Sequence, residues 1–345
     1  MRISNRYKYY FRMVIVNKQL HIKAYEQGRL TGSLGKLMGL VADAFQQQGY
    51  TITKDTGLIW QGEPPGIIDT LNPYNALNVY TNTSRDKVTT ENNLFLGASG
   101  PLPGYFTLDR LGVWPWITPT YNNISTANYE RNDYPHDLIN SIKEQKQTLF
   151  YSNLINKGLD SPEPEGLPED HVLMIVSQMD NDWQDGWAMF GKVINRLILG
   201  DCKYPVVVKF DPRLLLDKDG NVNKSKLNAH KPMMDSLEAR GVKFYTGAES
   251  LHCILPKTRV VIVDEMSQFL EPLMYGVPVI THGAPPYHGV VKKIEHQHEL
   301  IPAIQDVSWS NEDLMNAWLA YYITSYACHD LVSTTRRVKE LLDVV

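Results

Sequence analysis

Polar residues that could bind a ligand stand between short apolar runs in the stretch from Arg259 to Gly289. Ser267 occupies the expected start of a helix, where its hydroxyl and backbone N–H suit a phosphate group. Glu271, one turn later, suits hydrogen bonds from ribose hydroxyls, and His282-Gly283 follows the next apolar run. A capping serine and a surface carboxylate give the same pattern, so the stretch predicts either a nucleotide phosphate site or an ordinary helix start.

The apolar runs around these residues predict a parallel α/β sheet. Residues 259–263 form a β-branched run long enough for a buried strand, 269–275 a short helix and 277–281 the next strand. Gly276 fits directly after that helix, where a left-handed residue ends it. Because ligands of parallel sheets bind outside the carboxyl ends of the strands, the polar residues stand where a ligand is expected.

The whole chain alternates between strands and helices, and its length of 345 residues favours two domains. We expect an N-terminal domain over residues 1–160, a C-terminal domain over 171–310, and closing helices over 311–345. The stretch 158–170, rich in proline and acidic residues, is expected to be the linker. Strands are expected at 9–16, 20–25, 51–53, 57–61, 78–80, 88–96, 172–176, 204–210, 242–245 and 260–263, and helices at 34–48, 136–154, 187–199, 225–240, 311–327 and 331–342.

Four segments, in this order, resemble the capsule polysaccharide glycosyltransferases of the β-Kdo transferase type. They are GPLPGYFTLDRLGVWPW (100–116), VLMIVSQMDND (172–182), VVVKFDPR (206–213), and SQFLE (267–271) with the Gly-Val-Pro-Val and His-Gly-Ala-Pro-Pro-Tyr segments that follow it. The resemblance implies an α/β protein of the GT-B fold, with two facing Rossmann-like domains and a cleft between them. It also implies transfer of a sugar from a nucleotide sugar to an acceptor.

The resemblance assigns expected roles to individual residues. A catalytic base or nucleophile is expected from the N-terminal domain, at Glu91, where the neighbouring Asn92 replaces an aspartate of the family, or at Asp109. Acceptor-side residues are expected in the aromatic block, at Tyr105, Trp114 and Trp116. The expected donor-binding residues are Gln178, Asp182, Lys209, Asp211, Ser267, Gln268, Glu271, His282 and Gly283.

The expected donor is a nucleotide sugar bound without a metal ion or other cofactor. Phosphate stabilisation would come from Ser267 and the cation of Lys209. Asp180-Asn181-Asp182 spells a DxD triplet, but its place after the first strand of the second domain matches the family block, so no metal is expected. Asp211 stands where the family has histidine, and because an aspartate repels phosphate, a UDP-sugar is favoured over a CMP-sugar.

Charge is concentrated at the amino terminus and bears on the acceptor. Residues 1–36 hold eight Lys and Arg, including Arg6 and Lys36, against one Glu, although the formal net charge of the chain is −4. Basic residues mixed with tyrosines suit a nucleic acid, an anionic membrane surface, or simply a solvated face. We therefore expect a hydroxymethylated base in phage DNA as the acceptor, with Arg6 and Lys36 contributing to its binding, and a capsule or surface glycan as the alternative.

Other classes of function stay open. A two-domain protein that binds the nucleotide without turnover would fit the replacements at Asn92 and Asp211, and an epimerase of nucleotide sugars is a weaker alternative. The sequence holds no apolar run long enough to cross a membrane and no signal-peptide pattern, so a cytoplasmic protein of a bacterium or a phage-infected cell, with no integral membrane contact, is expected. Three widely spaced cysteines fit a reducing compartment.

Overall fold

The computed structural model divides the chain into two compact units. One unit consists of Met1–Ile124 with Tyr321–Val345, and the other of Ser125–Ala320. Structural statements concern the described residues, which are 19–23, 32–55, 77–81, 93–97, 105–109, 135–141, 143–144, 164–176, 183–200, 202–210, 224–245, 249–263, 270–281 and 290–343.

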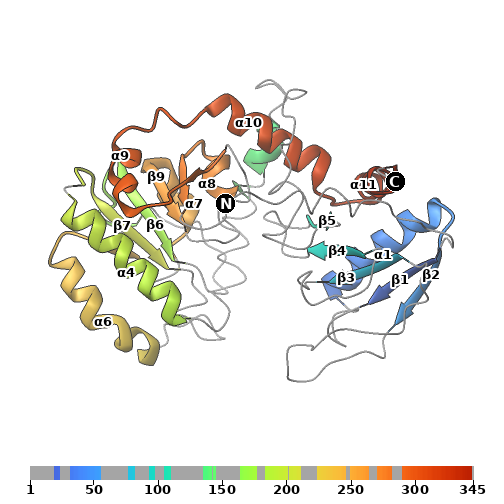
Figure 1. Ribbon diagram of the computed structural model, residues 1–345, viewed down its shortest axis with the longest axis horizontal. Coiled ribbons are helices and arrows are strands. Elements are labelled where there is room, and N and C mark those ends of the chain that lie inside the picture. Colours follow the sequence, from blue (N-terminus) through green and yellow to red (C-terminus); the bar gives the residue numbers. More distant parts are fainter. Residues whose placement is uncertain are drawn as a thin grey trace. The chain divides into compact units, whose positions relative to one another are not determined.

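The first unit is built on a sheet of order β2-β1-β3-β4-β5 (Figure 1). The first four strands of that unit are parallel, and β5 runs antiparallel to β4. The strands β1 to β4 lie close to their expected positions, whereas β5 was not expected. The strands expected over 9–16 and 57–61 lie outside the described residues. Their bounds are Gln19–Lys23 for β1, Thr51–Asp55 for β2, Leu77–Thr81 for β3, Asn93–Gly97 for β4 and Thr107–Asp109 for β5.

Helix α1, Gly32–Gln47, packs its apolar side into the core of this unit. Met38, Val41, Ala42 and Phe45 recur at helical spacing and are all buried. Gly49 follows the helix at φ 82°, a left-handed conformation that glycine adopts without a Cβ clash. The expected helix over 34–48, with Gly49 after its end, is therefore confirmed.

The second unit contains a parallel sheet of order β11-β10-β9-β6-β7-β8. The chain adds β7 and β8 on one side of β6, and then returns to add β9, β10 and β11 on the other side. That order is the one found in doubly wound nucleotide-binding sheets. The strands are β6 His171–Val176, β7 Val206–Phe210, β8 Lys243–Tyr245, β9 Thr258–Val263, β10 Val279–Thr281 and β11 Lys292–Lys293.

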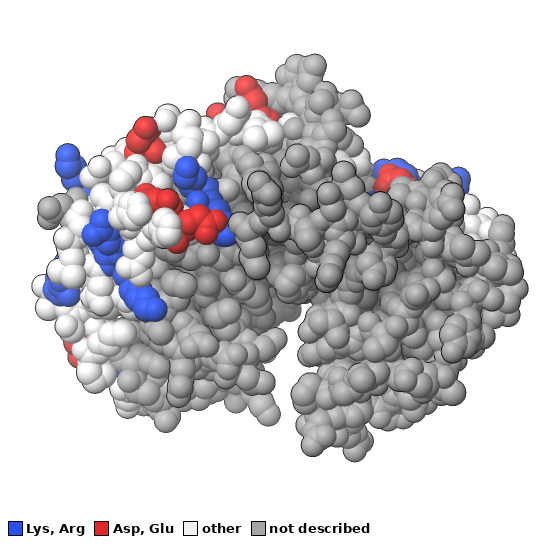
Figure 2. Space-filling model, viewed as in Figure 1, with Lys and Arg blue, Asp and Glu red and all other residues white. Residues whose placement is uncertain are grey.

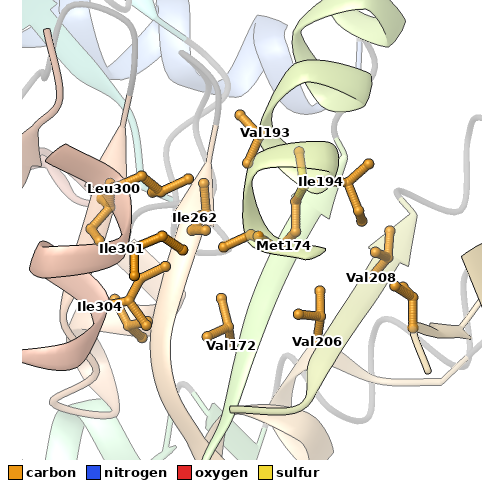
Figure 3. Close-up of a cluster of buried hydrophobic side chains, with 14 of the residues drawn as sticks. Val172, Met174, Val193, Ile194, Val206, Val208, Ile262, Leu300, Ile301 and Ile304 are labelled. Carbon is orange, nitrogen blue, oxygen red and sulfur yellow. The ribbon is translucent and has the colours of Figure 1, made fainter. Parts of the chain in front are cut away.

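One face of this sheet forms a core with α4, α6 and α9. Figure 3 shows Val172, Met174, Val206, Val208 and Ile262 pointing from the strands toward side chains of α4 and α9. The alternate residues of these strands point to the opposite face and are also buried, which explains their continuous apolar runs. The helices are α4 Trp183–Leu199, α6 Lys224–Glu238, α7 Leu251–Ile254, α8 Leu270–Met274, α9 Leu300–Gln305 and α10 Glu312–Tyr321, with 3₁₀ turns at Leu255–Lys257 and Gln297–Glu299.

The carboxyl-terminal segment completes the first unit. After α10 the chain forms a π-helical turn at Tyr322–Tyr326, and Cys328 pairs with Phe106 as an isolated β-bridge. Helix α11, Leu331–Asp343, then buries Val338 and Leu341 in the same core as α1. We expected one helix over 311–327; the helix ends earlier and becomes a π-helical turn at the point where the chain returns to the first unit.

The prediction of an α/β chain with two Rossmann-like units is confirmed by these two sheets. The expected linker, 158–170, differs in part. Residues 164–170 form an ordered turn of the second unit, in which Glu169 pairs with Lys257 at 2.7 Å and Asp170 with Arg259 at 3.6 Å. These acidic side chains serve as partners for basic residues far along the chain, which composition alone does not reveal.

Candidate functional site

The order of the second sheet defines where a ligand site is expected. Strands β6 and β9 are neighbours although β7 and β8 separate them in the chain, so the direction of winding reverses between them. In open parallel sheets, the crevice at the carboxyl ends of such a strand pair is the usual ligand site. Strand β6 ends at Val176 and β9 at Val263. The chain that follows them contains the predicted residues Gln178, Asp182, Ser267 and Gln268, which lie outside the described residues.

Lys209 lies at this edge of the sheet and is almost completely buried. It is the fourth residue of β7, pairs in register with Tyr245 at the end of β8, and is 3% exposed. Its ammonium nitrogen donates a hydrogen bond to the carbonyl of Phe210 at 3.0 Å and lies 3.7 Å from Oε2 of Glu249. The predicted cation is therefore at the carboxyl edge, accompanied by a carboxylate.

Glu271 belongs to α8, the short helix that follows the loop after β9. Leu270, Leu273 and Met274 anchor that helix in the interior, and Glu271 occupies its first turn with Oε2 buried. Gly276 follows at φ 68°, so the expected left-handed residue after this helix is confirmed. Lys209 and Glu271 both belong to the second unit. Lys209 is the residue before the last one of β7, and Glu271 lies in the first helix after β9.

Two side chains from other elements contact Tyr275, the residue that directly follows α8. The hydroxyl of Tyr275 lies 3.0 Å from Nδ1 of His252 in α7, and the ammonium of Lys143 lies 4.2 Å from the centre of the Tyr275 ring. Burial raises the pKa of Tyr275 to about 12 and lowers the pKa of Lys143. At neutral pH Tyr275 keeps its proton, and its ring faces a cation, which is a favourable cation–π arrangement.

The remaining donor-side predictions follow directly after described strands. Asp211 follows Phe210, the last residue of β7, and His282 and Gly283 follow Thr281, the buried last residue of β10. All three lie outside the described residues. Among the donor-side predictions, the structure thus describes the positions of Lys209 and Glu271, and the donor-binding roles of these two residues and of the others stay predictions.

Asp109, one of the two predicted catalytic carboxylates, is enclosed in the first unit. It is 0% exposed, accepts a hydrogen bond of 2.6 Å from the hydroxyl of Tyr326, and lies 3.6 Å from Nη2 of Arg337. Arg337 also stacks on the Tyr326 ring at 4.7 Å and donates to the carbonyl of Leu108. Burial, and then the charge of Asp109, raise the pKa of Tyr326 well above its ordinary value.

This environment favours a structural role for Asp109, because a carboxylate without solvent contact and with two partners holds the carboxyl-terminal segment in place. The catalytic role expected of Glu91 stays a prediction, because Glu91 lies outside the described residues.

Two of the predicted acceptor-side residues are described. Tyr105 is buried and stacks on His329 with ring centroids 4.5 Å apart, and burial followed by the charge of Asp330 raises its pKa. Lys36 is exposed on α1. Arg6, Trp114 and Trp116 lie outside the described residues. Tyr105 therefore packs as part of the fold, whereas Lys36 is open to solvent.

The described part of the chain shows neither a metal-binding cluster nor a membrane-spanning helix. There, no group of three or more His, Cys, Asp or Glu is arranged to hold a metal ion, and Asp180 and Asp182 fall outside it. In that part, no helix combines the length and apolar character needed to cross a bilayer. Figure 2 shows basic and acidic side chains interspersed on the described surface of the second unit in this view. Metal independence stays a prediction.

Sequence reasoning missed Glu249, His252 and Lys143 at this site. Each acts through a partner distant in the chain: Glu249 is 40 residues from Lys209, and Lys143 and His252 both meet Tyr275. The only sequence signal for Glu249 was indirect, since a lysine inside an apolar strand run needs a nearby counter-charge.

Comparison with known proteins gives similarity at the level of structure only. Neither a protein-family model nor a curated protein matches the sequence. Similar solved structures include KpsC of Thermosulfurimonas dismutans, a β-Kdo 2,7 transferase, at 13% identity over 95% of this chain and 98% of that chain, with a TM-score of 0.42. Anabaena Alr3699/HepE in complex with UDP is 11% identical over 95% and 100% of the two chains, with a TM-score of 0.41. The UDP-GlcNAc 2-epimerase of Methanocaldococcus jannaschii is 9% identical over 95% and 100%, with a TM-score of 0.39. These scores are low, so the fold of this chain is defined by its own strand order and registers.

Proposed function

We propose that this chain is a nucleotide-sugar-dependent glycosyltransferase whose second unit binds the donor. The observation that carries the proposal is the reversal of winding between β6 and β9. In the sequence, the predicted donor residues Gln178 and Asp182 follow β6, and Ser267 and Gln268 follow β9. Ligands of doubly wound sheets bind at such a reversal, so the order of the strands and the motif residues independently indicate the same edge.

The chemistry of the proposed donor site is stabilisation of a leaving phosphate. Lys209 supplies a positive charge at the carboxyl edge of the sheet, in a buried position where electrostatic interactions are stronger than in water. Ser267 would donate to the same phosphates, and Glu271 would accept hydrogen bonds from the ribose. We propose UDP as the carrier and no metal ion, with Glu91 as the base that activates the acceptor or as the nucleophile at the anomeric carbon of the sugar.

A thermal-shift screen with UDP, CMP, GDP and ADP tests the donor site. A nucleotide that binds only the folded protein adds about 2.7 kcal/mol of stability at one hundred times its dissociation constant, so the melting temperature rises. We expect UDP to give the largest shift, and Ser267→Ala and Glu271→Ala to lose it. Ser333→Ala is the matched control, because Ser333 donates and accepts only around the start of α11 in the first unit.

Two outcomes decide between the classes of function. No shift with any of the four nucleotides would overturn the donor site. A UDP shift without any release of sugar, either to an acceptor or to water, would favour the alternative of a binding protein without turnover.

Activity that chelator abolishes and a divalent cation restores would overturn metal independence.

For the acceptor, we propose a hydroxymethylated base in DNA, on the basis of the basic, tyrosine-rich amino terminus. The test is transfer of labelled sugar from the donor identified above to duplex DNA with and without hydroxymethylated bases, beside a capsule-type oligosaccharide. Binding to DNA should weaken steeply as salt increases, because phosphate contacts release counterions. Transfer to the oligosaccharide alone would select the surface-glycan alternative.

A further inference from the structure

Lys209 and Glu249 form an ion pair that lacks a hydrogen bond. The ammonium nitrogen of Lys209 and Oε2 of Glu249 are 3.7 Å apart, which is close enough for charge attraction but too long for a hydrogen bond. Within the described part of the chain, this oxygen of Glu249 is buried and accepts no hydrogen bond. The carboxylate has thus given up water at one oxygen without gaining a replacement, and such burial carries a cost.

The two partners differ in their freedom to move. The side chain of Lys209 is 4% exposed and is fixed within β7, between β6 and β8. The side chain of Glu249 is 31% exposed and stands outside any strand, four residues after β8 ends at Tyr245. If the pair separates, Glu249 can turn toward solvent while Lys209 stays in place.

The pair lies at the edge where the proposed donor phosphate binds. Lys209 is in register with Tyr245, the last residue of β8, so its side chain leaves the sheet close to the carboxyl end. An anion that reaches this ammonium competes with the carboxylate for the same positive charge. A phosphate oxygen at hydrogen-bonding distance would form a shorter, charge-assisted bond than the existing contact.

We propose that Glu249 is an internal competitor for the donor phosphates. In the ligand-free protein its carboxylate neutralises the buried ammonium of Lys209, and the diphosphate of a bound nucleotide sugar displaces it. The inference rests on the proposed function, because it assumes that a nucleoside diphosphate binds beside Lys209. Glu249 therefore raises the stability of the protein without the donor and lowers its affinity for the donor.

The test is calorimetric titration of UDP into wild type and Glu249→Gln. Removing the competitor should tighten UDP binding about fivefold, the size expected for an ion pair with one partly exposed partner. The same variant should melt at a lower temperature without ligand, because the buried ammonium of Lys209 loses the negative charge of Glu249. Glu169→Gln is the matched control: it removes the ion pair with Lys257 before β6 and β9 begin, and should leave UDP affinity unchanged.

A double-mutant cycle with Lys209→Met assigns the effect to this pair. Methionine fills the space of the lysine stem without a charge, so Lys209→Met should weaken UDP binding. Glu249→Gln added to Lys209→Met should then have no further effect. Weaker UDP binding by Glu249→Gln alone would make Glu249 a ligand contact and overturn the proposal, as would unchanged binding. If UDP binds neither wild type nor any variant, the proposed function fails together with this inference.

Discussion

Asp109 illustrates how a carboxylate with the sequence context of a catalytic residue can serve the fold. It sits at the end of β5, inside the first unit, with Tyr326 and Arg337 as its partners. The guanidinium of Arg337 lies in turn 3.1 Å from Glu340, which is partly exposed. The cluster joins a short antiparallel strand to the π-helical turn and to α11.

Asp109→Asn should destabilise the first unit by about 3 kcal/mol, because the buried Arg337 then loses the negative charge of Asp109 and keeps that of the partly exposed Glu340. Urea unfolding measures this loss. The control is Glu340→Gln, which affects the same arginine from a side chain that is 44% exposed, and should cost less than about 1 kcal/mol. A stable Asp109→Asn protein that has lost only its turnover would restore the catalytic assignment.

Residue-level prediction succeeded where a residue's role follows from its own strand or helix. Gly276 was expected to be left-handed because it follows a short helix, and its φ is 68°. It could not succeed where a role depends on a distant partner. Tyr326 and Arg337 are more than two hundred residues from Asp109, and nothing in the local pattern indicates that they meet.

At the scale of elements, the turn before β6 is held by a buried histidine. Nδ1 of His171 lies 2.7 Å from the carbonyl of Pro168, which can only accept, so this nitrogen carries the hydrogen. Nε2 lies 3.0 Å from the hydroxyl of Thr258, the first residue of β9. The ring thereby connects the entry of β6 to the entry of its neighbour β9.

This histidine should make the second unit less stable in mild acid. Burial lowers the pKa of His171 from its ordinary value of 6.5, so the folded state favours the neutral ring. As pH falls through 6.5, the unfolded chain binds a proton before the folded chain does, and the contribution to stability is lost. Urea unfolding between pH 7.5 and 5 measures the slope. His171→Gln keeps a polar side chain without a titration in this range, and should reduce the slope; an equal slope in both proteins would contradict the assignment.

Prediction of elements worked best where strands are buried on both faces. The runs of β6, β7 and β9 are continuous and apolar because both sides of the second sheet are covered, and each was expected within a few residues. Some short elements were missed, although the five-residue helix α8 was expected. Helices α7 and α9 span four and six residues, too few for a helical repeat to stand out, and β11 consists of two exposed lysines at the sheet edge.

At the scale of the whole molecule, the first unit depends on residues from the far end of the chain. Its core combines Phe45 of α1 and Leu94 of β4 with Val338 and Leu341 of α11. The sequence predicted α11 as a closing helix, but the amphipathic pattern of a helix does not state which core it closes. From the sequence we therefore predicted domains that follow one another along the chain. In the structure, the first unit is made of two segments that are separated in the sequence.

Two valines of α11 test this dependence, because they have the same side chain in opposite surroundings. Val338 is 0% exposed and Val332 is 76% exposed. Val338→Ala should destabilise the first unit by about 2 kcal/mol through lost burial and the cavity left behind. Val332→Ala should change the free energy of unfolding by less than about 0.5 kcal/mol, as expected for a surface position.

Hydrogen exchange shows where the loss of stability appears. In Val338→Ala, amide exchange should accelerate in α1, which shares its core with α11, and stay unchanged in β6 and β7 of the second unit. Acceleration in β6 and β7 to the same degree would mean that the two units unfold together, and the carboxyl-terminal helix would then stabilise the whole chain. Exchange that is unaltered in α1 would contradict the placement of α11 on the first unit, because a helix that shares a core with α1 must protect its amides.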